Sequence, residues 1–66
     1  MSGRENVKFV ARAYGEDVRK TIRFVEDFAE IGEYIDAPVK TYSSGMMARL
    51  AFGLSMAIEF ECYLID

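Results

Sequence analysis

A run of thirteen residues, Met46–Ile58, does most to limit what this chain can fold into. Its only charged residue is Arg49, and its apolar residues fall on every side of a helix rather than on one face. A helix that is apolar all round is covered by other parts of a protein or by lipid. The run is well short of the roughly 20 residues that cross a bilayer. It therefore predicts a buried helix whose neighbours lie largely outside these 66 residues.

The composition is typical of a small folded unit and excludes several kinds of site. Hydrophobic residues make up 52% of the 66 residues, which is too many for a disordered segment. Cys62 is the only cysteine and there is no histidine, which excludes an intrachain disulfide and a zinc site of cysteine and histidine. The same lack of histidine leaves Ser43 and Ser44 without a base to activate them as nucleophiles. The net charge of −3 is the wrong sign for nucleic-acid binding, so we expect no nucleic-acid partner.

The first 14 residues predict an amphipathic helix over about Gly3–Tyr14. Ser2 and Glu5 have the spacing of a capping box, in which each side chain pairs with a backbone N–H of the other residue. Gly15 suits the left-handed turn that ends many helices. The apolar stripe at helical spacing consists of Val7, Val10, Ala11 and Tyr14.

A second amphipathic helix is predicted from Asp17, a favourable N-cap residue, to Gly32. Its apolar stripe consists of Val18, Ile22, Val25 and either Phe28 or Ala29. A short irregular segment is expected next, because Pro38 keeps the residue before it out of helical geometry.

The last residues, Phe60–Asp66, predict a short strand. Cys62–Ile65 is continuously apolar, as in a strand that is covered on both faces of a parallel sheet. The expected fold is therefore mainly α, with three helices and a C-terminal strand that has no sheet to join.

Two segments carry possible binding chemistry. Ser43-Ser44-Gly45 leads into the third helix, where small residues and unpaired N–H groups suit a phosphate, although a plain serine N-cap explains the same residues. Asp66 follows the apolar strand and is placed to hold a hydrated Mg²⁺, although an aspartate that enters a turn explains it equally.

Together these segments resemble part of the ATP-binding-cassette (ABC) transport ATPases. Tyr42-Ser43-Ser44-Gly45-Met46 is similar to the family's signature motif, commonly Leu-Ser-Gly-Gly-Gln, and Cys62–Asp66 is similar to its Walker B strand and aspartate. The resemblance implies a piece of an α/β P-loop NTPase, namely a partial nucleotide-binding domain over 1–66. It divides the chain into a helical subdomain (1–41), the signature motif with its helix (42–58) and the Walker B strand (60–66).

The resemblance also implies roles for single residues. Ser43 and the Gly45 N–H would contact the γ-phosphate of ATP held by the opposite subunit of a dimer, and Asp66 would orient Mg²⁺ through water. Ser44 and Met46 complete the ATP-binding motif, and both depart from the family pattern. Ser44 adds a Cβ where the family has glycine, and Met46 removes the polar side chain of a glutamine.

Other parts of the family's ATP site do not occur in this sequence. The phosphate-binding loop Gly-x-x-x-x-Gly-Lys-Ser/Thr is missing, as is the switch histidine. The lid-loop glutamine and the catalytic glutamate are expected before and after these residues. Phosphoryl transfer relies on several such groups at once. We therefore expect the parent protein to hydrolyse ATP and this chain alone not to do so.

Within the family, Arg49-Leu50-Ala51-Phe52 and Ser55-Met56-Ala57-Ile58 resemble the ATPases that export capsular and O-antigen polysaccharides. This implies a second ATPase subunit and a transmembrane permease as partners, with the protein peripheral at the cytoplasmic face of a bacterial inner membrane. Phe9, Phe24 and Ile31 are candidate docking residues, although ordinary helix packing explains each of them.

A function of another class stays open. The chain would then be a free-standing helical module that binds proteins, or a second copy of itself, through the apolar third helix. Met46, Met47 and Met56 would suit such an adaptable surface.

Overall fold

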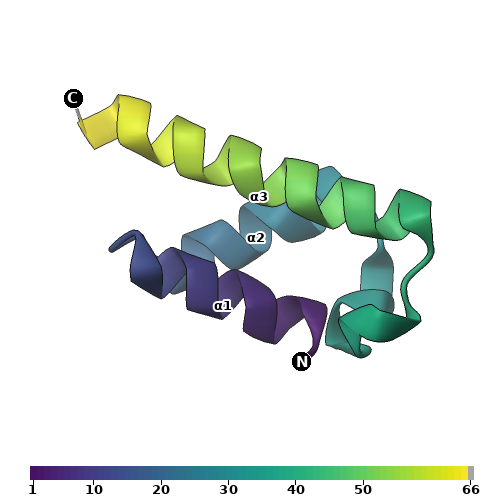
Figure 1. The fold of residues 1–66 in the computed structure, drawn as a ribbon. Coiled ribbons are helices and arrows are strands. Elements are labelled where there is room, and N and C mark those ends of the chain that lie inside the picture. Colours follow the sequence, from purple (N-terminus) through teal and green to yellow (C-terminus); the bar gives the residue numbers. More distant parts are fainter. Residues whose placement is uncertain (66) are drawn as a thin grey trace.

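The computed structural model describes the backbone of residues 1–65 and the side chains of residues 1–60. Three helices form the molecule: α1 (Gly3–Ala13), α2 (Val18–Ala29) and α3 (Ser44–Ile65). Two short 3₁₀ helices, η1 (Gly32–Asp36) and η2 (Val39–Thr41), connect α2 to α3. The helix α2 packs against both other helices, whereas α1 and α3 contact each other much less (Figure 1). The prediction of a mainly helical fold is confirmed.

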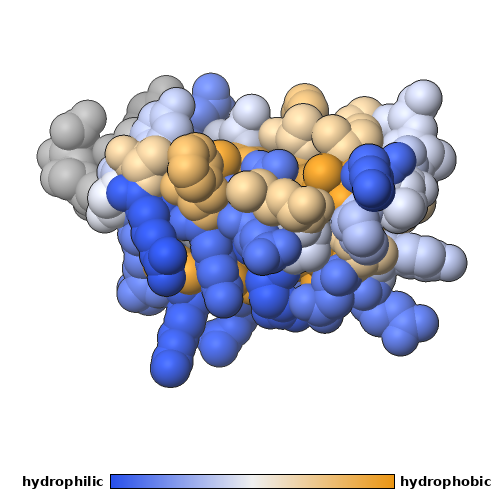
Figure 2. Space-filling view, turned by 60° about the horizontal axis from the view of Figure 1, so that its bottom comes forward, coloured by the Kyte–Doolittle hydropathy of each residue, from blue (hydrophilic) through white to orange (hydrophobic). Residues whose placement is uncertain are grey.

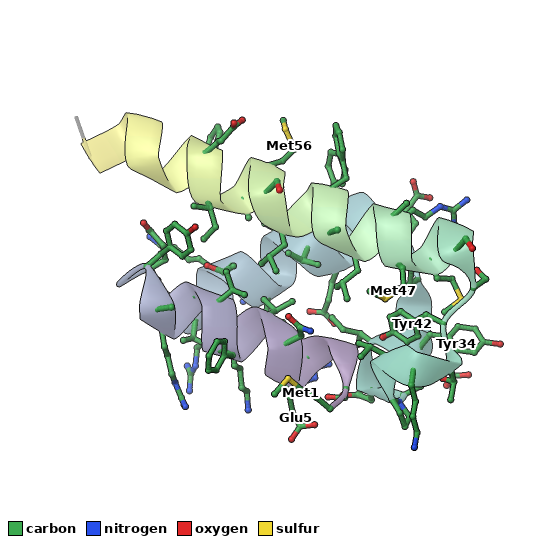
Figure 3. The ribbon with its side chains drawn as sticks, in the orientation of Figure 1. Met1, Glu5, Tyr34, Tyr42, Met47 and Met56 are labelled. Carbon is green, nitrogen blue, oxygen red and sulfur yellow. The ribbon has the colours of Figure 1, made fainter. Side chains whose placement is uncertain are left out.

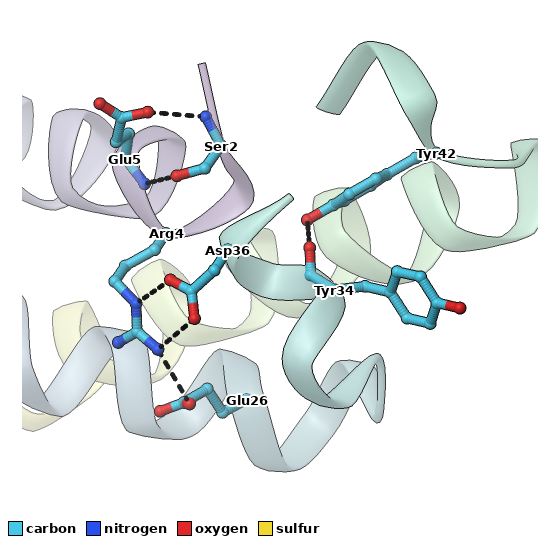
Figure 4. Close-up of polar contacts among 7 residues, drawn as sticks. All are labelled: Ser2, Arg4, Glu5, Glu26, Tyr34, Asp36 and Tyr42. Atoms are coloured by element: carbon cyan, nitrogen blue, oxygen red, sulfur yellow. Dashed lines mark hydrogen bonds and ion pairs between the residues drawn. The ribbon is translucent and has the colours of Figure 1, made fainter. Parts of the chain in front are cut away.

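The predicted capping box begins α1. The hydroxyl of Ser2 accepts from the Glu5 N–H at 3.1 Å, and the Glu5 carboxylate accepts from the Ser2 N–H at 2.8 Å (Figure 4). Val7 and Ala11 of the predicted stripe are fully buried. Gly15 follows in the left-handed region with φ +72°, as expected for a residue that ends a helix.

The helix α2 begins as predicted but ends earlier. The Asp17 carboxylate accepts from the Lys20 N–H at 3.0 Å. The stripe residue at the end of the helix is Ala29, which is fully buried, whereas Phe28 is 42% exposed. The predicted end at Gly32 is wrong, because Glu30 already adopts left-handed geometry with φ 53°. This reversal of the backbone turns the following Ile31 into the core.

The irregular segment closes the end of the molecule where α1 begins. Ile35 of η1 is buried, and the Val39 N–H donates to the Met1 carbonyl at 2.9 Å. Ser2 and Pro38 form an isolated antiparallel bridge beside this bond. The segment therefore holds the N-terminus of α1 near the start of α3, as Figure 1 shows.

An ion pair that the sequence analysis did not predict joins three elements. Arg4 of α1 donates to the Asp36 carboxylate at 2.7 Å and lies 3.5 Å from Glu26 of α2 (Figure 4). The hydrogen bond between Arg4 and Asp36 lowers the pKa of the Asp36 carboxyl and raises the pKa of the Arg4 guanidinium. Arg4 and Asp36 are 32 positions apart, so local patterns in the sequence do not reveal their contact.

The predicted strand is wrong for residues 60–65, which continue α3, and Asp66 lies outside the described residues. A strand needs a neighbour to pair with its N–H and C=O groups, whereas a helix satisfies these groups internally. The part of the chain that the structure describes contains no strand that could serve as that neighbour. Helix is therefore the conformation in which these residues satisfy their backbone.

The helix α3 buries one side and exposes another. Leu50, Gly53 and Ala57 are buried in the bundle, whereas Phe52 is 60% exposed and Met56 is 37% exposed. Met56 points away from the other helices in Figure 3. The prediction that this helix is apolar beyond what the chain can cover agrees with these exposures.

Four phenylalanines form a row along the surface of α2 and α3. Their ring centroids lie 5.7 Å apart between Phe52 and Phe28, 5.9 Å between Phe28 and Phe24, and 6.1 Å between Phe24 and Phe60. Hydrophobic residues also gather along one side of the face in Figure 2, and hydrophilic residues along the other.

The three candidate docking residues differ in their exposure. Phe9 is 66% exposed, Phe24 is half-buried against the core, and Ile31 is buried. Ordinary packing therefore accounts for Ile31 and in part for Phe24.

Candidate functional site

The segment Ser43–Met46 forms the start of α3. The chain reaches it through η2 and Tyr42, whose backbone is extended and whose N–H donates to the Val39 carbonyl at 3.0 Å. The four residues are consecutive, so the helix start brings all of them together. Ser43, Ser44 and Gly45 are exposed, and Met46 is half-buried.

Ser43 is the N-cap of α3. Its hydroxyl accepts from the Met46 N–H at 3.1 Å, and its carbonyl accepts from the Met47 N–H at 2.9 Å. The serine N-cap that the sequence left open is therefore formed. A serine hydroxyl also has one O–H to donate and a second lone pair, so the capping bond does not use all of its capacity.

The first two N–H groups of α3 are available to a ligand. Among the described residues, no acceptor pairs with the N–H of Ser44 or of Gly45. Both residues are exposed at the positive end of the helix dipole. Two unpaired N–H groups and the Ser44 hydroxyl at a helix N-terminus suit an anionic oxygen such as that of a phosphate.

Gly45 is not required by the fold around it. A Cβ at this position would have as its nearest neighbour only the Ser43 hydroxyl oxygen, at 3.9 Å, and the backbone of Gly45 does not have a positive φ. An alanine would therefore fit both the space and the geometry. The absence of a side chain leaves room for a ligand to approach the backbone closely.

Met46 differs from its three neighbours. Its side chain packs against the hydrophobic core, and its N–H is bonded to Ser43. Its side chain therefore anchors the start of the helix. In this position a polar glutamine side chain would meet apolar groups.

The proposed metal ligand, Asp66, lies outside the described residues, so its position relative to Ser43 is not described. Among the side chains of residues 1–60, no three from His, Cys, Asp or Glu come close enough to hold a metal ion. None of the helices described has both the length and the hydropathy of a membrane-spanning segment.

Tyr42 appears in the sequence analysis only as the first residue of the motif, with no role of its own. Its hydroxyl donates to the carbonyl of Tyr34 (Figure 4). The end of its ring also lies close to Gly3 of α1. Burial raises the pKa of the Tyr42 hydroxyl. The one signal in the sequence was an aromatic residue where the signature motif commonly has leucine.

Known proteins match the whole chain at high identity, although no protein-family model matches it. It is 60% identical over 68 aligned residues to the polysialic acid transport ATP-binding protein KpsT of Escherichia coli. It is 53% identical to the capsule polysaccharide export ATP-binding protein CtrD of Neisseria meningitidis serogroup B. It is 52% identical to the ATP-binding protein BexA of Haemophilus influenzae. Each alignment covers 100% of this chain but only 30–31% of the relative.

Proposed function

We propose, from the premise that this chain is homologous along its whole length to a short part of the polysaccharide-export ABC ATP-binding proteins, that it acts as the signature half of an ATP site. In the longer protein, the N-terminus of α3 would contact an ATP molecule that is bound mainly by a second subunit. The surface polysaccharide exported by such a protein would be capsular or of a related kind, since the names of the relatives specify polysialic acid and capsule polysaccharide.

One observation supports the nucleotide contact more than any other. The N–H groups of Ser44 and Gly45 are unpaired and exposed at the N-terminus of a 22-residue helix. The next N–H, that of Met46, donates to the Ser43 hydroxyl. The N–H groups of Ser44 and Gly45 are therefore the ones left unpaired at this helix start. A γ-phosphate oxygen would complete the hydrogen bonds that the two open N–H groups lack.

Three residues of the segment would contact the phosphate, and Met46 would complete the motif beside them. Ser44 and Gly45 would donate backbone N–H groups to the γ-phosphate, and the Ser43 hydroxyl, which accepts in the capping bond, would donate its one proton. The helix dipole would favour the negative charge of the phosphate. ATP supplies the phosphoryl group and Mg²⁺ neutralises its charge, and Asp66 would hold that Mg²⁺ through water.

The chain would not hydrolyse ATP alone. Its segment offers hydrogen-bond donors but no phosphate-binding loop and no base that positions water, and phosphoryl transfer needs these groups together. The partners in the longer protein would be a second ATP-binding subunit and a transmembrane permease. The location would be peripheral, at the cytoplasmic face of a bacterial inner membrane.

A chimera tests this function directly. This chain would replace the matched segment of KpsT, which is about 30% of that protein, and ATP hydrolysis and polysialic acid export would be measured. We expect hydrolysis within a few-fold of the parent. A chimera that folds and binds ATP but has no hydrolytic activity above background contradicts the proposal.

A titration with a fluorescent ATP analogue and Mg²⁺ separates the two halves of the site. The chain alone should give no binding, and addition of intact nucleotide-loaded KpsT should enhance binding. Tight binding by the chain alone would mean that the phosphate site has been placed wrongly.

The exposed phenylalanines favour a second candidate function, a helical module that binds other proteins. Phe52 and Phe60 are 60% and 54% exposed and continue the row of stacked rings on α2. A row of exposed rings of this kind marks a surface that another protein can cover. This function predicts binding to a different protein through these rings without nucleotide, whereas the signature half-site predicts that contact with an intact ATP-binding subunit depends on ATP.

A further inference from the structure

Tyr42 connects the start of α3 to the start of α1. It directly precedes the N-cap Ser43, and its own hydroxyl donates to the backbone carbonyl of Tyr34 in η1. The contact does not use the Tyr34 side chain, which is 59% exposed. Its ring points away from Tyr42 in Figure 4. The bond therefore fixes the residue before the N-cap to a short helix in the middle of the connection.

Gly3 makes room for this contact. A Cβ at Gly3 would collide with the Tyr42 hydroxyl and would lie 3.0 Å from the Ile35 carbonyl oxygen. Gly3 is buried and has no positive φ, so close packing and not backbone geometry accounts for glycine here. Any side chain at position 3 would push Tyr42 away from η1.

We propose that Tyr42 is a positioning residue, whose hydroxyl bond to the Tyr34 carbonyl over Gly3 sets the orientation of the Ser43–Met46 segment. The positioning itself depends only on the fold, whereas its effect on ATP chemistry rests on the proposed function. With Tyr42 held, Ser43 faces the Met46 N–H and the N–H groups of Ser44 and Gly45 remain open. Without the bond, the residue before the N-cap can rotate and the cap weakens.

Amide hydrogen exchange of the chain carrying Tyr42→Phe tests the positioning. This variant keeps the ring and removes the hydroxyl. We expect exchange of the Met46 and Met47 amides to rise about two- to tenfold, the range that loss of one neutral hydrogen bond gives. Exchange of the Ala57 amide, in the middle of α3, should not change. Unchanged rates, or an equal rise along the whole helix, would overturn the proposal.

Tyr34→Phe is the matched control. It removes the same atom from the neighbouring tyrosine but leaves the Tyr34 carbonyl that accepts the bond. We expect no local change in exchange. An effect equal to that of Tyr42→Phe would show that the loss of any tyrosine hydroxyl near η1 is enough, and would overturn the specific role of Tyr42.

Gly3→Ala approaches the same contact from the other side. It should raise the exchange rates of the Met46 and Met47 amides in the wild-type background. The rise should be smaller in the Tyr42→Phe background, because phenylalanine lacks the atom with which the new Cβ collides. Strictly additive effects would contradict a shared contact.

The chimera with KpsT carries the test to function. Tyr42→Phe should lower kcat for ATP hydrolysis about two- to tenfold and leave the affinity of the isolated subunit for ATP unchanged. A purely structural role would lower the folded fraction but not kcat per folded molecule. If the chimera is active and Tyr42→Phe does not change its kcat, the inference is overturned. If the wild-type chimera is inactive, the result counts against the proposed function. The exchange data then decide the positioning.

Discussion

Gly45 is the residue at which the demands of the fold and of the proposed site differ most clearly. The helix start has room for an alanine at this position, since the nearest atom to an added Cβ is 3.9 Å away. Alanine is also the better helix former by about 0.5–1 kcal/mol. A glycine that the fold does not need, and that carries one of the two open N–H groups, is consistent with close approach by a ligand.

Gly45→Ala should therefore separate stability from function. We expect the free energy of unfolding of the chain to stay the same or rise by up to about 1 kcal/mol, measured by urea titration. In the chimera with KpsT, the added methyl group should lower kcat for ATP hydrolysis about tenfold or more, because it occupies the approach to the backbone N–H groups.

Gly53→Ala in the same helix serves as the control. Gly53 is buried, and a Cβ there would lie 3.3 Å from a ring carbon of Phe28, away from the helix start. This variant should change stability with little effect on kcat. If Gly53→Ala and Gly45→Ala lower kcat equally, the loss reflects packing of α3 and not the site.

At the scale of the elements, one arginine joins the start of α1 to the parts of the chain that lead to α3. Arg4 contacts Asp36 of η1 at 2.7 Å and Glu26 of α2 at 3.5 Å. The groups are partly exposed, and exposed ion pairs contribute little to stability on average. The interest of this pair lies in its pH dependence, because the hydrogen bond from Arg4 lowers the pKa of Asp36 below its ordinary value of 3.8.

Asp36→Asn should reduce the sensitivity of the fold to acid. A carboxylate with a lowered pKa binds fewer protons in the folded state than in the unfolded state, so its contribution is present at neutral pH and is lost as pH falls through the folded pKa. The Glu5 carboxylate, whose pKa is lowered by its bond to the Ser2 N–H, acts in the same direction. We expect wild type to lose stability between about pH 5 and pH 2, and the variant to lose less of it.

The measurement is the midpoint of thermal unfolding by circular dichroism across this pH range. Glu33→Gln is the control, since it removes a carboxylate from the same short helix but not one that contacts Arg4. Equal pH profiles for wild type and Asp36→Asn would exclude a role for the pair in acid stability.

Sequence patterns predicted those elements whose causes are local. The capping box of Ser2 and Glu5, the cap at Asp17 and the turn at Gly15 each depend on residues a few positions apart. The patterns did not predict the early end of α2 at Glu30, because the cause is the burial of Ile31 against distant residues. The strand over 60–66 was predicted from apolarity alone, but a strand also needs a neighbour.

The candidate site was predictable to a different degree. The position of Ser43–Gly45 at a helix start followed from residue types and spacing. The inward position of Met46 and the anchor at Tyr42 did not follow, because both depend on packing between segments far apart in the sequence.

At the scale of the whole molecule, the chain has more apolar surface than it can bury. The row Phe52, Phe28, Phe24 and Phe60 lies on α2 and α3 with three of its four rings more than 40% exposed. A chain of 66 residues has a small core, and an uncovered row of aromatic rings favours association. We expect the isolated chain to pair with a second copy through this row.

Phe52→Ser should weaken that association. Sedimentation velocity over a range of concentrations should show the wild-type chain shifting from monomer to dimer, with the dissociation constant of the variant raised about tenfold or more. Phe9→Ser is the matched control, because Phe9 is 66% exposed on α1 but is not part of the row. A wild-type chain that stays monomeric throughout contradicts the expectation.

The bond between the Val39 N–H and the Met1 carbonyl has a consequence for how the molecule is made. During translation Met1 leaves the ribosome well before Val39. The helices α1 and α2 can therefore form and pair before the Val39 N–H is available to bond the Met1 carbonyl. This bond can form only after η2 has emerged, and the start of α3 follows η2 within a few residues. A nascent chain exposed only as far as residue 30 should therefore hold a helical hairpin in which the segment around Met1 is accessible to protease, and exposure of η2 should protect that segment.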